Sequence, residues 1–299
     1  VLAVLLRPAQ TPGRIRWGRD VAIPVAAGAV AVAVLLFTPQ DHVRMVIGII
    51  GLVFAVGLVA LAGNPIRLAV GLAAAFLISM APRLAEPPLE QQRNFFGVVK
   101  VLYDAPHDMN LMVNGSTSHG GQLRSPDKRR ELTSYYSARG PYGDVIDVRT
   151  AQGRAHDIAA IGLGTGTIAC SGPPEARWTF FEINLAVVEV ATEHFTYLKR
   201  AEESAQVHVE MGDARLRLRE GEVGRFDIIV LDAFSSDAVP THLVTREAFQ
   251  VYRRALRPGG LLLAHVSNDH DHVQLTPVMG ALAKDAGMYA IDRRDDDLT

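Results

Sequence analysis

Hydrophobic residues follow two different patterns along the 299-residue chain. Long runs without a charged side chain come first, and after them the apolar residues occur in short stretches separated by polar ones. The uncharged runs are residues 21–37, 45–62 and 68–81. A helix of about 20 apolar residues is long enough to cross a bilayer. The pattern therefore predicts transmembrane segments within residues 1–82, as a fragment of a larger membrane region, followed by a folded polar part.

The next part of the chain predicts a linker and a small β domain. Residues 83–93 combine prolines with charged side chains, which is typical of a linker. Strand-like runs follow at residues 95–103 and 109–113, and the glycines of NGSTSHGGQ, residues 114–122, indicate a turn. The spacing predicts a small antiparallel β domain over residues 94–155.

From residue 156 onward, strand-like and helix-like segments alternate. The strand-like runs each end in Gly, Asp, Asn or Glu, and they are HDIAAIGLGTG, RWTFFEIN, VHVEMGD, FDIIVLD and LLLAHVSN. Helix-like segments lie between them, at residues 185–198 and 241–256 among others. The alternation predicts a parallel, doubly wound α/β sheet over residues 156–299, with its binding crevice at the carboxyl ends of the strands. MYAID, residues 288–292, predicts a sixth strand, after which the domain is expected to be C-terminally truncated.

Composition excludes several classes of function. A net charge of -2, without a basic cluster among aromatic residues, argues against a nucleic-acid-binding protein. Cys170 is the only cysteine, which excludes an intramolecular disulfide and a cysteine-based zinc site. His270 and His272 in NDHDH are typical of a solvated loop rather than of a metal site. No metal is therefore expected.

A glycine turn and acids at consecutive strand ends predict a nucleoside site. Gly162, Gly164 and Gly166 in IGLGTGT follow the first strand-like run, where they allow a ligand to approach the backbone closely. Glu182 ends the second run about 20 residues later, the position from which a carboxylate binds ribose hydroxyls. Asp213 ends the third run, within reach of an adenine edge. The pattern favours an S-adenosylmethionine-type site, with a redox dinucleotide as the alternative.

A series of motifs in this order resembles the spermidine synthase family, and specifically its membrane-fused branch. The motifs are NFFGVVKV, LMVNGSTSHGGQ, LTSYYS, GPYGD, IGLGTGT, FFEIN, GDARL, VLDAFSSDAVPTHLVTREAF and LRPGGLLLAHVSN, which extend from residue 94 to about residue 280. The resemblance implies a small N-terminal β domain before a methyltransferase-like Rossmann domain. It also implies an aminopropyltransferase that uses decarboxylated S-adenosylmethionine and putrescine or a related amine.

The resemblance also assigns roles to single residues. Asp232 matches the catalytic aspartate, which orients the amine and accepts its proton. Tyr135 and Asp237 match residues of the amine pocket. The residues implied to bind the co-substrate are Gln122, Gly162, Gly164, Thr165, Gly166, Glu182, Asp213 and Ala214. His119 in SHGGQ is open to two interpretations, as a residue of the pocket entrance or as a turn residue.

Departures from the family pattern keep alternative functions open. Thr165 stands where soluble synthases have an aspartate that holds the aminopropyl ammonium, and Asn184 replaces a second acid after Glu182. Ala233 and Phe234 are inserted in the loop after Asp232. The alternatives are an S-adenosylmethionine-dependent methyltransferase and a non-catalytic membrane protein that binds a polyamine or nucleoside.

Location and assembly are expectations as well. The basic loop with Arg7, Arg14, Arg16 and Arg19 is expected in the cytoplasm. Three crossings would place residue 83 onward outside, whereas the cofactor is a cytosolic metabolite. We expect a multi-pass inner-membrane protein with a cytoplasmic catalytic domain. The family resemblance also implies a homodimer.

Overall fold

A computed structural model describes residues 87–115, 117–133, 136, 140–233, 239–266 and 275–292. The predicted transmembrane segments within residues 1–82 lie outside these described residues. Within the described ranges, no helix has both the length and the apolar character needed to cross a membrane.

The first sheet is antiparallel and has four strands in the order β1-β2-β3-β4. Its strands are β1 (Glu90–Asn94), β2 (Gly97–Asp104), β3 (Met109–Asn114) and β4 (Thr117–Leu123), and the short 3-10 helix η3 (Ala105–His107) joins β2 to β3. The predicted antiparallel β unit is confirmed. Two details differ, because β1 begins inside the predicted linker and β4 occupies the later part of the segment predicted as a glycine turn.

The glycines of β4 are there because neighbouring groups lie too close for a side chain. A Cβ atom on Gly120 would lie 2.6 Å from Thr165 Oγ1, and one on Gly121 would lie 2.6 Å from Met109 Cε. Glycine in a strand often marks such a close approach. Gly115, between β3 and β4, does lie in a turn and has a φ angle of 63°, as the pattern predicted. Gly120 and Gly121, in contrast, reflect tight packing of a strand.

The second sheet is parallel and has five strands in the order β7-β6-β5-β8-β9. Its strands are β5 (Asp157–Ile161), β6 (Arg177–Glu182), β7 (Gln206–Met211), β8 (Phe226–Leu231) and β9 (Leu256–Ala264). The helices are α5 (Pro141–Ala151), α6 (Leu185–His194), α7 (Tyr197–Glu202), α8 (Ala214–Glu220), α9 (Arg246–Ala255) and α10 (Leu275–Asp285), with 3-10 helices η5 (Thr167–Ser171) and η6 (Thr241–Leu243). The predicted parallel, doubly wound sheet is confirmed.

Several local predictions for this part were wrong. Residues 288–292 form no strand, and α5 lies in the range predicted as a β domain. The helix predicted at residues 185–198 is split into α6 and α7, because Phe195 is extended. The glycine turn leads into the five-residue 3-10 helix η5 rather than an α-helix.

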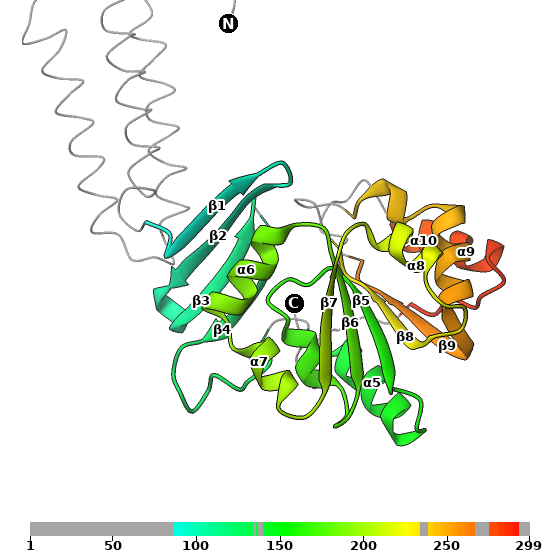
Figure 1. The fold of residues 1–299 in the computed structure, drawn as a ribbon, viewed down its shortest axis with the longest axis horizontal. Coiled ribbons are helices and arrows are strands. Elements are labelled where there is room, and N and C mark those ends of the chain that lie inside the picture. Colours follow the sequence, from blue (N-terminus) through cyan, green and yellow to red (C-terminus); the bar gives the residue numbers. More distant parts are fainter. Residues whose placement is uncertain are drawn as a thin grey trace, which may run out of the picture. The chain divides into compact units, whose positions relative to one another are not determined.

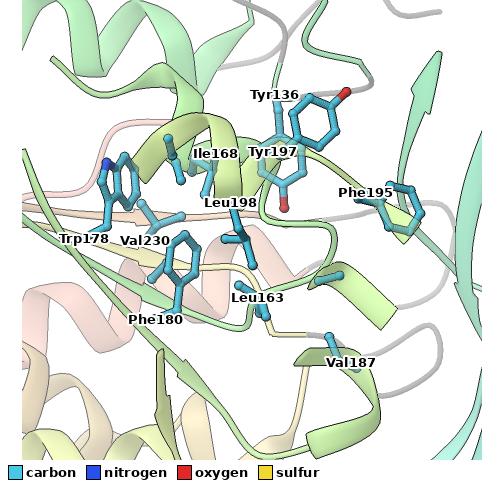
Figure 2. Close-up of a cluster of buried hydrophobic side chains, with 14 of the residues drawn as sticks. Tyr136, Leu163, Ile168, Trp178, Phe180, Val187, Phe195, Tyr197, Leu198 and Val230 are labelled. Atoms are coloured by element: carbon cyan, nitrogen blue, oxygen red, sulfur yellow. The ribbon is translucent and has the colours of Figure 1, made fainter. Parts of the chain in front are cut away.

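Both faces of the parallel sheet are buried, so its strands alternate between two cores. Ile158, Ala160, Ile228 and Val230 face one core, with α5, α6 and α7. The alternate residues of the same strands face the other core, with α8, α9 and α10. Figure 2 shows part of the first core, in which Trp178 and Phe180 stack with ring centroids 5.7 Å apart. Burial on both faces explains why these strands are continuously apolar.

Helix α6 connects the two sheets (Figure 1). Val190 and Ala191 of α6 belong to the same buried cluster as Val99 and Val101 of β2. Asn184 caps the start of α6 by accepting a hydrogen bond from the Ala186 amide, at 3.1 Å. The small sheet is therefore packed against the carboxyl-end region of the parallel sheet, where the candidate site lies.

The opposite, amino end of the sheet is held by an ionic network. Arg257 donates to Asp227 at 2.9 Å and to Asp157 at 2.7 Å. Arg177 also donates to Asp157, at 2.6 Å from its Nε. Burial acts to raise the pKa of both carboxyls, but their hydrogen bonds to arginine and backbone groups outweigh it, so each pKa lies below its ordinary value. The network therefore stabilises the fold in the ionised state.

Replacing Arg257 by Met is expected to lower the free energy of unfolding by about 1–3 kcal/mol at pH 7, because Asp157 and Asp227 lose a shared cation that is partly exposed. The depressed carboxyl pKa values mean that this stabilisation is present at neutral pH and lost as pH falls through them. The difference from wild type should therefore shrink below about pH 4. Urea unfolding at several pH values measures it, with Arg219→Met, an exposed residue of α8, as control. A pH-independent difference would contradict the account.

Candidate active site

A cavity of about 260 Å³ lies at the carboxyl ends of the parallel strands. Strands β5 and β6 contribute their last residues to its wall, as do the segments that follow β7 and β8 and residue His119 of β4. The carboxyl edge of a parallel sheet is where ligands bind in doubly wound folds. The crevice predicted from the strand pattern is therefore present.

The glycine turn lets three elements meet at the cavity. A Cβ atom on Gly162 would lie 2.6 Å from the backbone oxygen of Asp232, and one on Gly164 would lie 2.9 Å from the backbone oxygen of His119. On Gly166, a Cβ atom would collide with Leu198 of α7. All three glycines also have positive φ angles. Gly162 and Gly164 line the cavity, so the turn both shapes the site and anchors its neighbours.

Glu182 fastens the glycine turn to the end of β6. Its carboxylate accepts the Leu163 amide at 3.0 Å and the Asn184 amide at 2.8 Å. Burial raises the pKa of Glu182, while these backbone hydrogen bonds act in the opposite direction. Glu182 also lines the cavity. The predicted ribose-binding acid is thus placed at the site and has a structural task in addition.

Asn184 offers an unused donor to the cavity. Its Oδ1 accepts from Ala186 N and from Asn94 Nδ2, the latter at 2.5 Å. Its Nδ2 is buried and has no hydrogen-bond partner among the described residues. A buried polar group without a partner is unfavourable, so a ligand oxygen at this position would be stabilising.

Asp213 and Ala214 lie at the start of α8 and line the same cavity. Asp213 caps that helix by accepting the Leu216 amide at 2.9 Å. Its other oxygen lies 2.8 Å from Nε2 of His242, which also lines the cavity. The predicted adenine-side residues are therefore at the site, and His242 is an addition that the sequence did not indicate.

Asp232 lies directly after β8, between two side chains from distant parts of the sequence. The Tyr136 hydroxyl donates to its Oδ2, and its Oδ1 lies 3.0 Å from Nδ1 of His265. Tyr142 packs against both partners, with ring centroids 6.0 Å from Tyr136 and 6.5 Å from His265. These contacts fix the orientation of the carboxylate at the cavity wall.

Two predicted residues of the amine pocket, Tyr135 and Asp237, lie outside the described residues. So does Phe234 of the loop after Asp232, whereas Ala233 lines the cavity. The predictions for Tyr135 and Asp237 stay predictions.

Two predicted co-substrate residues, Gln122 and Thr165, are buried away from the cavity wall. Gln122 donates to the Arg129 carbonyl and to Thr196 Oγ1 and accepts the Thr196 amide, so its amide joins β4 to the corner before α7. Thr165 is fully buried, with its hydroxyl 2.7 Å from that of Thr167. Neither side chain is among the described residues that line the cavity.

The sequence interpretation missed Tyr136 and His265, which hold Asp232. His265 follows β9, so its place at a strand end was a usable signal of the same kind as that of Glu182. Tyr136 gave no comparable signal, because it is 96 positions from Asp232 and only the tertiary fold joins them.

The cavity suits a polar, cationic ligand with an apolar part. Glu182, Asp213 and Asp232 supply carboxylates, and none of the described lining residues is Lys or Arg. Leu163, Val187 and other side chains supply an apolar wall. Unpartnered buried nitrogens of Asn184 and His119 point to ligand contacts. The residues present therefore fit a nucleoside carrying a positive charge.

Comparison with known proteins finds relatives that match part of this sequence. No protein-family model matches the sequence. The polyamine aminopropyltransferase of Vibrio vulnificus (strain CMCP6) is 33% identical over 127 residues, which are 40% of this chain and 41% of that protein. Putrescine N-methyltransferase 1 of Nicotiana tabacum is 27% identical over 94 residues, which are 31% of this chain and 25% of that protein.

Among solved structures, a probable spermidine synthase from Corynebacterium glutamicum matches with a TM-score of 0.47 and 18% identity, covering 60% of this chain and 63% of that one. The chain spans about two fifths of the length of the Vibrio relative. The resemblance predicted from the motifs is confirmed: this chain is similar in sequence to the spermidine synthase, or polyamine aminopropyltransferase, family.

Proposed function

We propose that the protein is an aminopropyltransferase that moves an aminopropyl group from decarboxylated S-adenosylmethionine to putrescine or a related amine. The observation that carries the proposal is the cavity in which Glu182, Asp213 and Asp232 meet without a described lysine or arginine. Such a wall favours a sulfonium co-substrate and an ammonium acceptor. The sequence similarity to a polyamine aminopropyltransferase supports the same reaction.

Asp232 is proposed to prepare the acceptor. An ammonium group must lose a proton before its nitrogen can attack the carbon next to a sulfonium. The Asp232 carboxylate, held by Tyr136 and His265, is proposed to orient the amine and accept that proton. The nitrogen then bonds to carbon while the carbon–sulfur electron pair moves to sulfur, leaving methylthioadenosine. Asp237 and Tyr135 are proposed to complete the amine pocket.

Glu182, Asn184 and Asp213 are proposed to hold the nucleoside. Glu182 and the unpartnered Nδ2 of Asn184 supply an acceptor and a donor for ribose hydroxyls. Asp213 and Ala214 are proposed to lie beside the base. Gln122 and Thr165 are proposed to act indirectly, since Gln122 holds β4 to the corner before α7 and Thr165 packs β4 on the glycine turn.

A second candidate is methyl transfer from S-adenosylmethionine to an amine. Two observations favour it: residue 165 is a buried threonine and supplies no carboxylate for an aminopropyl ammonium, and a putrescine N-methyltransferase is among the relatives. The acceptor would be the same class of amine, so the two candidates differ in the group transferred.

Incubation of the full chain with putrescine and each sulfonium in turn should give methylthioadenosine with decarboxylated S-adenosylmethionine, detected by mass spectrometry. Asp232→Asn should lower this turnover by about 10²- to 10⁴-fold, because the proton acceptor is lost while the shape is kept. Asp147→Asn, on the exposed side of α5, is the matched control. S-adenosylhomocysteine as the product would favour methyl transfer, and equal rates for Asp232→Asn and wild type would contradict the role of Asp232.

Glu182→Gln should weaken binding of methylthioadenosine by about 10-fold or more, since one acceptor for the Leu163 or Asn184 amide becomes a donor and the ribose loses a charged acceptor. Titration calorimetry measures the affinity. Glu189→Gln, an exposed residue of α6, is the control. If the affinity of the variant for methylthioadenosine stays within about 2-fold of wild type, Glu182 does not bind the nucleoside. A 10-fold loss corresponds to about 1.4 kcal/mol of binding free energy.

We also propose that residues 1–82 anchor the protein in the inner membrane, as in the membrane-fused branch, with the catalytic domain in the cytoplasm and the protein a homodimer. The uncharged runs support the anchor. The full chain should stay in the membrane pellet after carbonate extraction and elute from a sizing column in detergent at twice its monomer mass. Release into the supernatant would contradict the anchor.

A further inference from the structure

His119 lies in the candidate active site, and one of its ring nitrogens is buried without a partner in the described part of the chain. His119 is one of the residues that line the same cavity as Asp232. Its Nε2 is buried and has no hydrogen-bond partner among the residues that the structure describes. Buried polar atoms are nearly always paired, by protein, water or ligand. The unpaired nitrogen therefore indicates a group that arrives from the cavity.

The backbone places His119 there by an irregularity in the small sheet. Leu111 pairs with Gly121 and Val113 pairs with Ser118, so His119 and Gly120 together oppose the single residue Met112. Such a β-bulge redirects a side chain and is common beside active sites. His119 therefore lies in a bulged strand and not in a turn. Of its two interpretations, as a pocket residue or as a turn residue, the structure favours the first.

Close packing holds the bulge on the glycine turn. A Cβ atom on Gly164 would lie 2.9 Å from the backbone oxygen of His119, and a Cβ atom on Gly120 would lie 2.6 Å from Thr165 Oγ1. His119 therefore keeps a fixed position relative to the turn that also borders Asp232.

Charge decides which hydrogen-bonding role His119 can play. Burial lowers the pKa of His119, and the nearby charge of Asp232 offsets this only in part. Among the described lining residues, the other titratable side chains are Glu182, Asp213 and His242. A neutral imidazole at pH 7 can accept a hydrogen bond on one ring nitrogen.

We propose that His119 is a binding residue for the acceptor amine and accepts a hydrogen bond at Nε2 from the nitrogen that attacks, an inference that rests on the proposed function. A neutral primary amine has two N–H bonds and one lone pair. Acceptors on two sides, Asp232 and His119, fix both N–H bonds and so direct the lone pair toward the carbon. Asp232 alone would leave the nitrogen free to rotate about one hydrogen bond.

Steady-state kinetics of the full chain tests the assignment. His119→Phe keeps a ring but removes the acceptor, and should lower kcat/KM for putrescine by about 10- to 100-fold with the KM for the sulfonium co-substrate within about 2-fold. His119→Gln restores an acceptor and should recover part of the loss. The wild-type fall in kcat/KM at acid pH that comes from protonating His119 should be absent in the Gln variant.

His107→Phe is the matched control, because His107 is an exposed histidine of η3 next to the same sheet. It should behave as wild type. The proposal is overturned if His119→Phe keeps the wild-type kcat/KM for putrescine, or if the change appears instead in the KM for the sulfonium co-substrate.

Imidazole NMR separates this inference from the proposed reaction. The His119 Cε1–H signal is identified as the one that is absent from the spectrum of His119→Gln. Putrescine added in the presence of methylthioadenosine should shift this signal. If putrescine shifts the His119 signal although the protein transfers no aminopropyl group, the proposed reaction is wrong but His119 still contacts the amine. An unmoved signal would overturn the role of His119 even if the enzyme is active.

Discussion

The close approach permitted at the glycine turn is the constraint on which the rest of the site depends. Gly162 lies against the backbone of Asp232, and Gly164 lies against the backbone of His119. A side chain at either position would separate the loop after β8 or strand β4 from the end of β5. Glu182 then fixes the turn from the other side through its two backbone hydrogen bonds. One short segment thus sets the distances among the groups proposed to bind both substrates.

The two ends of the parallel sheet use carboxylates in different ways. At the amino end, Asp157 and Asp227 are neutralised by Arg177 and Arg257, so their charges stabilise the fold. At the carboxyl end, the described lining contains acids but neither Lys nor Arg. Asp232 is held instead by a tyrosine hydroxyl and a histidine, and Glu182 by backbone amides. That end keeps negative charge available for cationic ligands.

The parallel sheet and most of the candidate site could be predicted because both depend on local patterns. Apolar runs that end in Glu182, Asp213 and Asp232 place those acids at one edge of a sheet, and all three line the cavity. Strand β4 could not be predicted, because its glycines are required by close contacts that local patterns do not reveal. Gly120 packs on Thr165, which is distant in the sequence, and Gly121 packs on Met109 of the neighbouring strand β3. The contact of the Gln122 amide with Thr196, 74 positions away, was equally out of reach, because the resemblance assigned Gln122 only a role in binding the co-substrate.

The most direct test of the account is a crystal structure of the full chain with methylthioadenosine and putrescine. We expect ribose hydroxyls within hydrogen-bonding distance of Glu182 and the Asn184 amide, and one putrescine nitrogen between the Asp232 carboxylate and Nε2 of His119. A nucleoside bound outside this cavity, or a putrescine that contacts neither Asp232 nor His119, would contradict the account.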